Sequence, residues 1–236
     1  MNDSPAPSVP RLSICFSVLN RSAVPRPNQP PLNLFPRCLE SVAKVMATLE
    51  MDTEIVIVDW DSSDWPLPQW VAATLGDLPY RIVPGQGKFH RGAGRNIAAH
   101  HARAEWLFFC DADMIVERVA LDNGLRYLAQ NQAYFAKFFY FLDDQHRQGF
   151  WCNGRGNCFL TRSMLERAGG WPCPPTYPHA RHGDQRFYDN VLAAGIPTVV
   201  ADEPGLLHQF HPGWSAHQIL TEKRHLIREG PDAARA

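Results

Sequence analysis

The chain has 236 residues, of which 23 are basic and 24 acidic, so its formal net charge is −1. This balance argues against a dedicated DNA- or RNA-binding protein, which needs a basic surface to displace counterions from phosphates. With 45% hydrophobic residues the chain can bury one sizeable core. We therefore expect one globular domain and no nucleic-acid partner.

The sequence contains no apolar run close to the roughly 20 residues that cross a bilayer. Residues 1–10 lack the basic start and apolar centre of a signal peptide, and their three prolines and two serines predict a disordered tail. We therefore expect a cytoplasmic protein without a transmembrane segment. The six cysteines are scattered and none forms a C-x-x-C pair, which argues against a structural zinc or a disulfide framework.

The first half of the chain alternates between strand and helix patterns. Apolar spacing predicts one helix over 35–49, after a proline-rich loop at 25–31, and another over 94–103. Apolar runs that stop at polar residues predict strands at 12–18, 54–58, 80–83 and 106–110. This order predicts an α/β fold with a mostly parallel, open twisted sheet flanked by helices. In such a sheet, ligands bind outside the carboxyl ends of the strands.

The second half is less regular. A helix is expected to start at 162 and another at or beside Asp184, and 214–228 predicts an amphipathic C-terminal helix. Segment 143–156 is polar and glycine-containing and is predicted to be a mobile loop that closes over a bound ligand. Further strands are expected at 133–142, 157–161 and 198–200.

Two carboxylates follow the predicted strand at 106–110. Asp111 and Asp113 stand two residues apart where the apolar run ends, so they could hold a divalent cation and leave open positions for phosphate oxygens. The spacing alone is common, and a solvated turn is the alternative. Unpaired charge is costly at the end of a buried strand, which favours the cation site.

Several short motifs run through the chain in a fixed order. They are Asn20-Arg21, Glu54 to Asp59 with Ser62-Ser63-Asp64, Gly92 to Ala98, Phe108 to Asp113, Gly169-Gly170-Trp171 and His182 to Gln185. Together they resemble the family 2 glycosyltransferases with the GT-A fold, over roughly residues 11–212. The later segment, with Gly156-Asn157 ahead of Asp184, is similar to the galactosyltransferase or chondroitin-polymerase type of catalytic domain.

The resemblance implies a division of the chain. A single GT-A domain would cover 11–212, with a nucleotide-binding half at 11–113 and an acceptor-binding half at 114–212. Residues 213–236 would form the C-terminal amphipathic helix and tail. The apolar face of that helix could pack on its own domain, which we favour. The alternatives are packing on a second subunit in a homo-oligomer and binding to a membrane surface.

The resemblance also implies roles for residues near the donor. Asp59 would accept from the nucleobase, Arg95 would sit near the ribose and diphosphate, and Asp111 would contact the ribose or a metal-bound water. A plain solvated helix residue is the alternative for Arg95. The full implied nucleotide-sugar-binding set is Asn20, Arg21, Asp59, Asp61, Arg95 and Asp111.

The metal and catalytic roles follow from the same resemblance. Asp113 would ligate Mn²⁺ or Mg²⁺, with His208 or His211 completing the metal shell. Asp184 would be the general base that takes the proton of the acceptor hydroxyl, in one in-line displacement with inversion. The alternatives are a helix-capping acid for Asp184 and ordinary surface or core histidines for the other two.

The acceptor site has weaker signals. Trp151 could stack on a pyranose or only anchor its loop, and His182 could meet the acceptor or lie on a solvated loop. Many relatives carry two adjacent acids where this chain has Gly183-Asp184, which puts acceptor recognition in doubt more than catalysis. Trp60 replaces a carboxylate of the usual second-strand motif, so it is either a base-stacking or a packed aromatic residue.

The leading hypothesis is therefore a metal-dependent, inverting glycosyltransferase. It would move a sugar from a nucleoside diphosphate, UDP in preference to GDP, to a hydroxyl of a glycan or other small acceptor. The alternatives are a regulatory module that binds nucleotide sugars without turnover and a sugar-phosphate nucleotidyltransferase. The latter normally has a glycine-rich, basic loop after the first strand, where this chain has Asn20-Arg21 followed by prolines.

Overall fold

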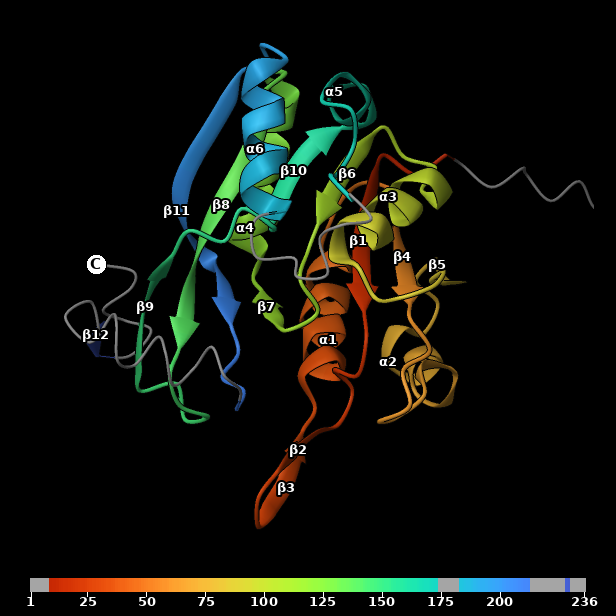
Figure 1. The fold of residues 1–236 in the computed structure, drawn as a ribbon, viewed down its shortest axis with the longest axis vertical. Coiled ribbons are helices and arrows are strands. Elements are labelled where there is room, and N and C mark those ends of the chain that lie inside the picture. Colours follow the sequence, from red (N-terminus) through yellow and green to blue (C-terminus); the bar gives the residue numbers. More distant parts are fainter. Residues whose placement is uncertain (1–8, 174–182, 213–227, 230–236) are drawn as a thin grey trace, which may run out of the picture.

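The computed structural model describes residues 9–173, 183–212 and 228–229 (Figure 1). The predicted tail before residue 9, His182 and most of the predicted C-terminal helix lie outside the described residues. Among the described helices, none is both long and apolar enough to cross a membrane.

The described helices are α1 (Leu34–Met46), α2 (Val71–Leu75), α3 (Arg91–His101), α4 (Arg118–Ala129), α5 (Arg162–Arg167) and α6 (Gly183–Ala193), with a 3-10 turn at Leu67–Gln69. The described strands are β1 (Leu12–Val18), β2 (Val24–Arg26), β3 (Gln29–Leu32), β4 (Thr53–Asp59), β5 (Tyr80–Pro84), β6 (Trp106–Phe109), β7 (Met114–Val116), β8 (Ala133–Phe141), β9 (Gln148–Cys152), β10 (Cys158–Thr161), β11 (Thr198–His208) and β12 (Arg228–Glu229).

The main sheet confirms the predicted α/β fold. Strands β5, β4, β1 and β6 are parallel to one another and lie within residues 11–113, the predicted nucleotide-binding half. Beyond β6 the order continues through β10, β8, β9 and β12, and these pairs are antiparallel. Strand β11 runs parallel to β8 and, after a register shift, also pairs with β7. The carboxyl ends of β1, β4 and β6 thus meet at one edge of the sheet.

Two layers of helices cover the sheet because its inner strands are apolar on both faces. Leu12, Ile14 and Phe16 of β1 pack in one cluster with α1, α2 and α4. Cys15 points to the other face, into a cluster with α3, α5 and α6. This alternation is the period of two that a strand imposes on its side chains. Figure 1 shows the helices on either side of the sheet.

The structure differs from the local predictions at five places. The proline-rich loop is a β-hairpin, β2–β3, and the segment after Asp113 forms β7 and α4, which apolar spacing did not reveal. Within the predicted mobile loop, β9 pairs with β8, because Phe150 is fully buried and stacks on Tyr140. The last predicted strand extends to His208. Arg228, placed in a helix by prediction, lies on β12.

Glu54 connects three segments of the chain by hydrogen bonds at the amino end of the sheet. Its carboxylate, on β4, accepts the Ser13 hydroxyl at 2.7 Å and both the backbone N–H and the Nε of Arg103, at 2.5 and 2.9 Å. The residue is 1% exposed. Burial alone would raise its pKa, but the hydrogen bonds from Arg103 and Ser13 outweigh burial and hold the pKa below its ordinary value of 4.5.

We expect Glu54→Gln to lower the free energy of unfolding by about 2 kcal/mol at pH 7, because a buried acceptor network loses its charge. A group with a lowered folded-state pKa contributes stability above its unfolded pKa and loses it as the pH falls through the folded value. The difference between variant and parent should therefore shrink below about pH 4. Urea unfolding from pH 3 to pH 7 measures it. Glu50→Gln, at an exposed position, is the control, and an equal effect there would contradict the network.

Candidate functional site

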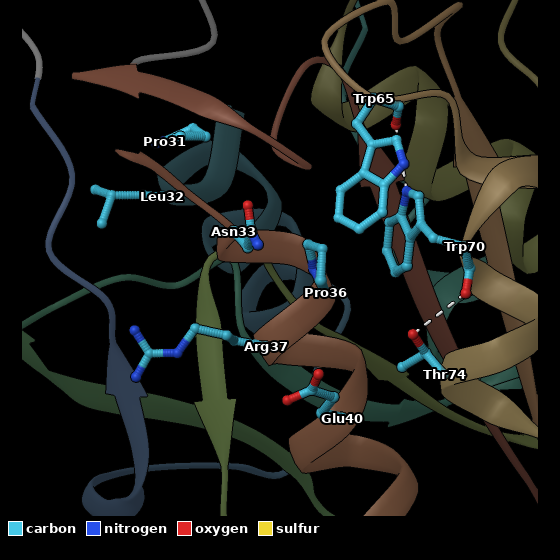
Figure 2. Close-up of a pocket in the computed structure, with 9 residues that line it drawn as sticks. All are labelled: Pro31, Leu32, Asn33, Pro36, Arg37, Glu40, Trp65, Trp70 and Thr74. Carbon is cyan, nitrogen blue, oxygen red and sulfur yellow. Dashed lines mark hydrogen bonds between the residues drawn. The ribbon is translucent and has the colours of Figure 1, made fainter. Parts of the chain in front are cut away.

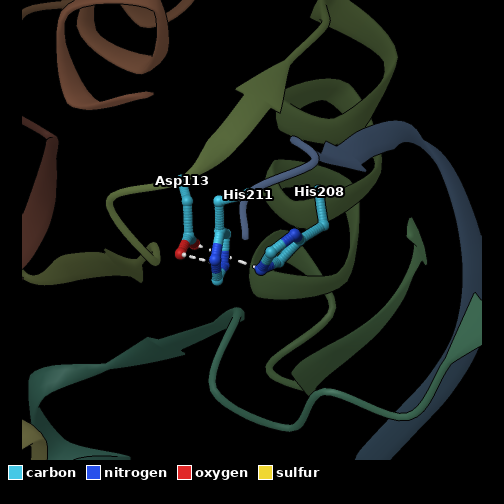
Figure 3. Close-up of side chains that lie close together, drawn as sticks. All are labelled: Asp113, His208 and His211. Atoms are coloured by element: carbon cyan, nitrogen blue, oxygen red, sulfur yellow. Dashed lines mark ion pairs between the residues drawn. The ribbon is translucent and has the colours of Figure 1, made fainter. Parts of the chain in front are cut away.

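Three predicted metal ligands come together at the carboxyl edge of the sheet. Asp113 follows β6, His208 ends β11 and His211 lies three residues further on. The Nε2 atom of His208 is 3.4 Å from one carboxylate oxygen of Asp113, and that of His211 is 3.5 Å from the other. One potential ligand atom from each residue lies within 4.8 Å of those of the other two (Figure 3).

The hydrogen bonds of the two histidines suit this arrangement. Nδ1 of His208 lies 2.8 Å from the carbonyl oxygen of Gln209, and Nδ1 of His211 lies 3.5 Å from that of Pro212. A carbonyl only accepts, so Nδ1 is the donor in these contacts, and a ring protonated at Nδ1 alone presents an Nε2 lone pair to Asp113. Lone pairs and a carboxylate that face one another are the donor set of a divalent cation.

The surroundings keep these groups in the states that bind metal. Burial by itself raises the pKa of Asp113, but His208, His211 and Arg21 outweigh it and lower the pKa. The Arg21 guanidinium lies 3.6 Å from the Asp113 carboxylate. Burial lowers the pKa of the His211 imidazole below 6.5, so this ring is neutral at neutral pH. The ring of His208 is fixed between Phe138 and Tyr140.

A buried arginine joins the other two predicted carboxylates. Arg95 on α3 donates to Asp184 at 2.5 Å through one nitrogen and to Asp111 at 2.7 Å through another, and its side chain is only 3% exposed. Its guanidinium lies over the ring of Trp171, 4.2 Å from the centroid. Burial would raise the pKa of Asp184, but Arg95 and Arg91 lower it below its ordinary value. Asp184 is therefore ionised at neutral pH.

A glycine and an asparagine shape the space around this arginine. A Cβ on Gly156 would lie 2.5 Å from the Arg95 guanidinium and 3.2 Å from the carboxylates of Asp111 and Asp184. A side chain at this position would therefore displace the guanidinium. The fully buried Asn157 holds Asp111 from both sides. Its amide oxygen accepts the Asp111 backbone N–H at 2.9 Å, and its amide nitrogen donates to the Asp111 carboxylate at 3.1 Å.

Both groups border one open cavity of about 480 Å³. Asp113 and His208 lie on its wall together with Asp111 and Asp184, while Arg95 is not among the lining residues. Arg21 and Arg91 supply positive charge, and Arg91 lies 3.7 Å from the Asp184 carboxylate. The rest of the wall is contributed by Ser17, Leu19, Phe89, Ala112, Phe138 and Gly154. The cavity can hold an anionic ligand against both a cation site and a carboxylate base.

Three residues of the predicted nucleotide-sugar-binding set, Asn20, Asp59 and Asp61, lie at the ends of β1 and β4. The Asn20 side chain accepts the backbone N–H of Ser63 at 2.8 Å, and the Asp59 carboxylate accepts that of Ser62 at 3.1 Å. Asp61 is exposed, with a positive φ of 62°. None of the three predicted residues lines the cavity, so their roles in nucleotide binding stay predictions.

Two aromatic predictions have different outcomes. Trp60 is packed: it is 7% exposed and its indole N–H donates to the Ser17 hydroxyl at 3.0 Å. Trp151 lies half-buried on β9, edge-on to Phe139, and is not among the residues that line the cavity. Its acceptor role stays a prediction, as does that of His182, which lies outside the described residues.

Three residues of the site were not assigned from sequence. Arg91 is one helical turn before Arg95, so helical spacing could have found it. Asn157 was part of a motif without a role, because only the fold brings it to Asp111. Phe89 is 40% exposed at the cavity and packs edge-on to Trp60, and no sequence pattern distinguished it.

The comparisons with known proteins agree with the fold. The model of glycosyl transferase family 2 matches residues 24–191, well over half of the chain. The chain therefore belongs to glycosyl transferase family 2, and its fold is that of GT-A glycosyltransferases. No sequence among the curated proteins matches the chain.

Solved structures of this fold are similar over most of the chain. The mannosyltransferase PcManGT from Pyrobaculum calidifontis, solved with GDP-Man and Mn²⁺, has a TM-score of 0.61 at 17% identity, covering 93% of this chain and 62% of that one. S. aureus TarS 1-349, solved with UDP-GlcNAc, has a TM-score of 0.64 at 15% identity, covering 88% of this chain and 60% of that one. The chain thus spans about three fifths of the length of either.

We expect Arg95→Met to lower the free energy of unfolding by about 3 kcal/mol, because two carboxylates would face each other without their cation. Adding Asp184→Asn should recover part of this loss, with a coupling of about 1 kcal/mol in the double-mutant cycle. Urea unfolding without nucleotide or metal measures all four proteins. The more exposed Arg91→Met is the matched control and should cost less. Strictly additive effects of the two substitutions would contradict the bridge.

Proposed function

We propose that the protein is a metal-dependent glycosyltransferase that uses a nucleoside-diphosphate sugar. The observation that carries the proposal is one cavity bordered by Asp113 and His208 on one part of its wall and by the ionised Asp184 on another. A binding module would need the first group but has no use for the second. Membership of glycosyl transferase family 2 supports the same conclusion.

The donor would bind at the carboxyl ends of β1, β4 and β6. Asp113, His208 and His211 would hold Mn²⁺ or Mg²⁺, which when bound neutralises charge on the diphosphate. Arg21 and Arg91 add fixed positive charge at the same cavity. Of the similar structures, PcManGT was solved with GDP-Man and Mn²⁺ and TarS with UDP-GlcNAc. We favour UDP because the segment around 156–184 resembles galactosyltransferase and chondroitin-polymerase domains.

Asp184 would act as the general base. It would take the proton of an acceptor hydroxyl while that oxygen forms its bond to the anomeric carbon, and the bond from this carbon to the diphosphate oxygen would break. One displacement of this kind inverts the anomeric carbon. The N-terminal position of Asp184 on α6 and its pairing with Arg95 and Arg91 keep it ionised. The acceptor would be a glycan or another small molecule with a hydroxyl group.

Arg95 would serve this reaction as a positioning residue. Both of its hydrogen-bonding partners are carboxylates of the site, and it does not border the cavity. It would therefore reach the ribose and diphosphate through Asp111, which it orients, and hold the base at a fixed place relative to the donor. Asn157 would orient Asp111 in the same way.

We expect one of UDP and GDP to bind with Mn²⁺ and only weakly without it. Asp113→Ala should weaken the metal-dependent binding about 100-fold, because it removes the carboxylate that faces both histidines. Calorimetric titration with and without Mn²⁺ measures this. Asp122→Ala, an exposed carboxylate on α4, should leave binding unchanged. If neither nucleotide binds under any metal condition, the transferase proposal is wrong.

The base has its own test. Asp184→Asn should keep Mn²⁺-dependent nucleotide binding within about threefold of the parent but lower donor turnover by about 10³-fold. Release of nucleoside diphosphate from a panel of UDP- and GDP-sugars, with and without glycan acceptors, measures turnover. Asp189→Asn, an exposed acid on the same helix, is the control. Tight donor binding by the parent protein without turnover of any donor would favour the regulatory binding module instead.

A further inference from the structure

A second hollow, of about 330 Å³, lies at the start of α1 and shares no residue with the cavity of Asp113 and Asp184. Figure 2 shows Pro31 and Leu32, from the β2–β3 hairpin, on one side of it and Trp65 and Trp70 on the other. The first turns of α1 lie between them. Its volume is at the lower end of the range of small-molecule sites.

The two tryptophans form an ordered aromatic wall. Trp70 is 5% exposed and Trp65 is half-buried, with ring centroids 5.5 Å apart and the planes inclined by 38°. The Trp70 indole N–H donates to the Trp65 carbonyl at 3.2 Å, so the pair is held in place before any ligand arrives. A broad, partly exposed indole offers an apolar face that suits the C–H face of a pyranose.

The polar side chains of the hollow have unused hydrogen-bonding capacity. Asn33 occupies the N-cap position of α1, yet its side chain does not cap the helix. Arg37 and Glu40 are exposed on the next turn. Within the part of the chain that the structure describes, the side chains of Asn33, Arg37 and Glu40 have no hydrogen bond or ion pair. An amide, a guanidinium and a carboxylate together can both donate to and accept from sugar hydroxyls.

The hollow continues along α1. A neighbouring depression of about 470 Å³ also includes Arg37 and Glu40 and extends to Lys44 and Arg118. At the other end, the carbonyl of Arg21, which borders the donor cavity, accepts the Phe35 backbone N–H at 2.8 Å. The start of α1 is thus hydrogen-bonded to a segment that lines the cavity of Asp113 and Asp184. A ligand of several linked units could occupy this surface.

We propose that the hollow beside Trp65 and Trp70 is a glycan-binding site that holds a pyranose unit of an extended acceptor, apart from the place of transfer. The choice of a glycan rests on the proposed function, but binding here needs neither donor nor metal. A proline-rich peptide also docks on aromatic grooves. The side-chain amide of Asn33, the guanidinium of Arg37 and the carboxylate of Glu40 can all hydrogen-bond to hydroxyl groups, which favours a sugar over such a peptide.

The test is binding of the full chain, without nucleotide or Mn²⁺, to an array of defined oligosaccharides from disaccharides to octasaccharides. Calorimetry with the strongest binder then compares variants. We expect Trp65→Ala to weaken binding about tenfold and Trp65→Phe, which keeps an aromatic face, to weaken it by less than about threefold. Asn33→Ala and Glu40→Ala change exposed side chains and should weaken binding without affecting folding. Trp106→Ala, a half-buried tryptophan at the opposite end of the sheet, is the matched control.

Several outcomes would overturn the proposal. Binding of no oligosaccharide by the parent protein is one, and preferential binding of proline-rich peptides is another. A third is glycan binding that is lost in Asp113→Ala but kept in Trp65→Ala, Asn33→Ala and Glu40→Ala, because the glycan would then sit in the donor cavity. The same samples are titrated with nucleotide and Mn²⁺. Failure of that titration alone would count against the transferase proposal and leave the glycan site standing.

Discussion

The arrangement of the site depends on one buried guanidinium group, that of Arg95. Arg95 holds Asp111 and Asp184 at either end of its guanidinium, and both carboxylates come from segments far apart in the chain. Without the arginine, Asp111 and Asp184 would face each other as uncompensated like charges, so neither would keep its position. The stack of Arg95 on Trp171, and of Trp171 on Phe187, extends this support into the core under α6.

The histidine side of the site is built on a different constraint. Strand β11 carries His208 to β7, so its end lies next to the chain that leaves Asp113. The backbone N–H of Gln209 donates to the Asp113 carbonyl at 2.9 Å, which fixes the two segments together. Backbone carbonyls then set the imidazole tautomers. Strand pairing thus determines where the three side chains of the candidate metal site lie relative to one another.

The cavity of Asp113 and Asp184 and the hollow at α1 both lie beside connections that leave the parallel strands, and the second half of the chain adds Phe138, Gly154, Asp184 and His208 to the cavity. Parallel strands bring their carboxyl ends to one edge, and the connections that leave that edge carry polar and aromatic residues. The connection after β1 contains Arg21, whose guanidinium lies beside the Asp113 carboxylate. It then forms the β2–β3 hairpin and leads into α1. One connection therefore borders both spaces, and it would link the proposed glycan site physically to the proposed donor site.

Much of the parallel half was predictable, because strands buried on both faces leave continuous apolar runs such as those at β1, β4 and β6. The family resemblance also predicted Asp113, His208 and His211, which the fold brings together, and Asp184, which borders the same cavity as Asp113. The hairpin was not predictable because its strands contain prolines. In α4 the helical pattern is interrupted by Gly124, which packs on Phe159, and polar residues on either side obscured β9. The sequence by itself determined which residue types are present and in what order. Only the tertiary structure decided that Arg95 pairs with two carboxylates and that Asn157 holds Asp111, because these contacts join segments that share no local periodicity.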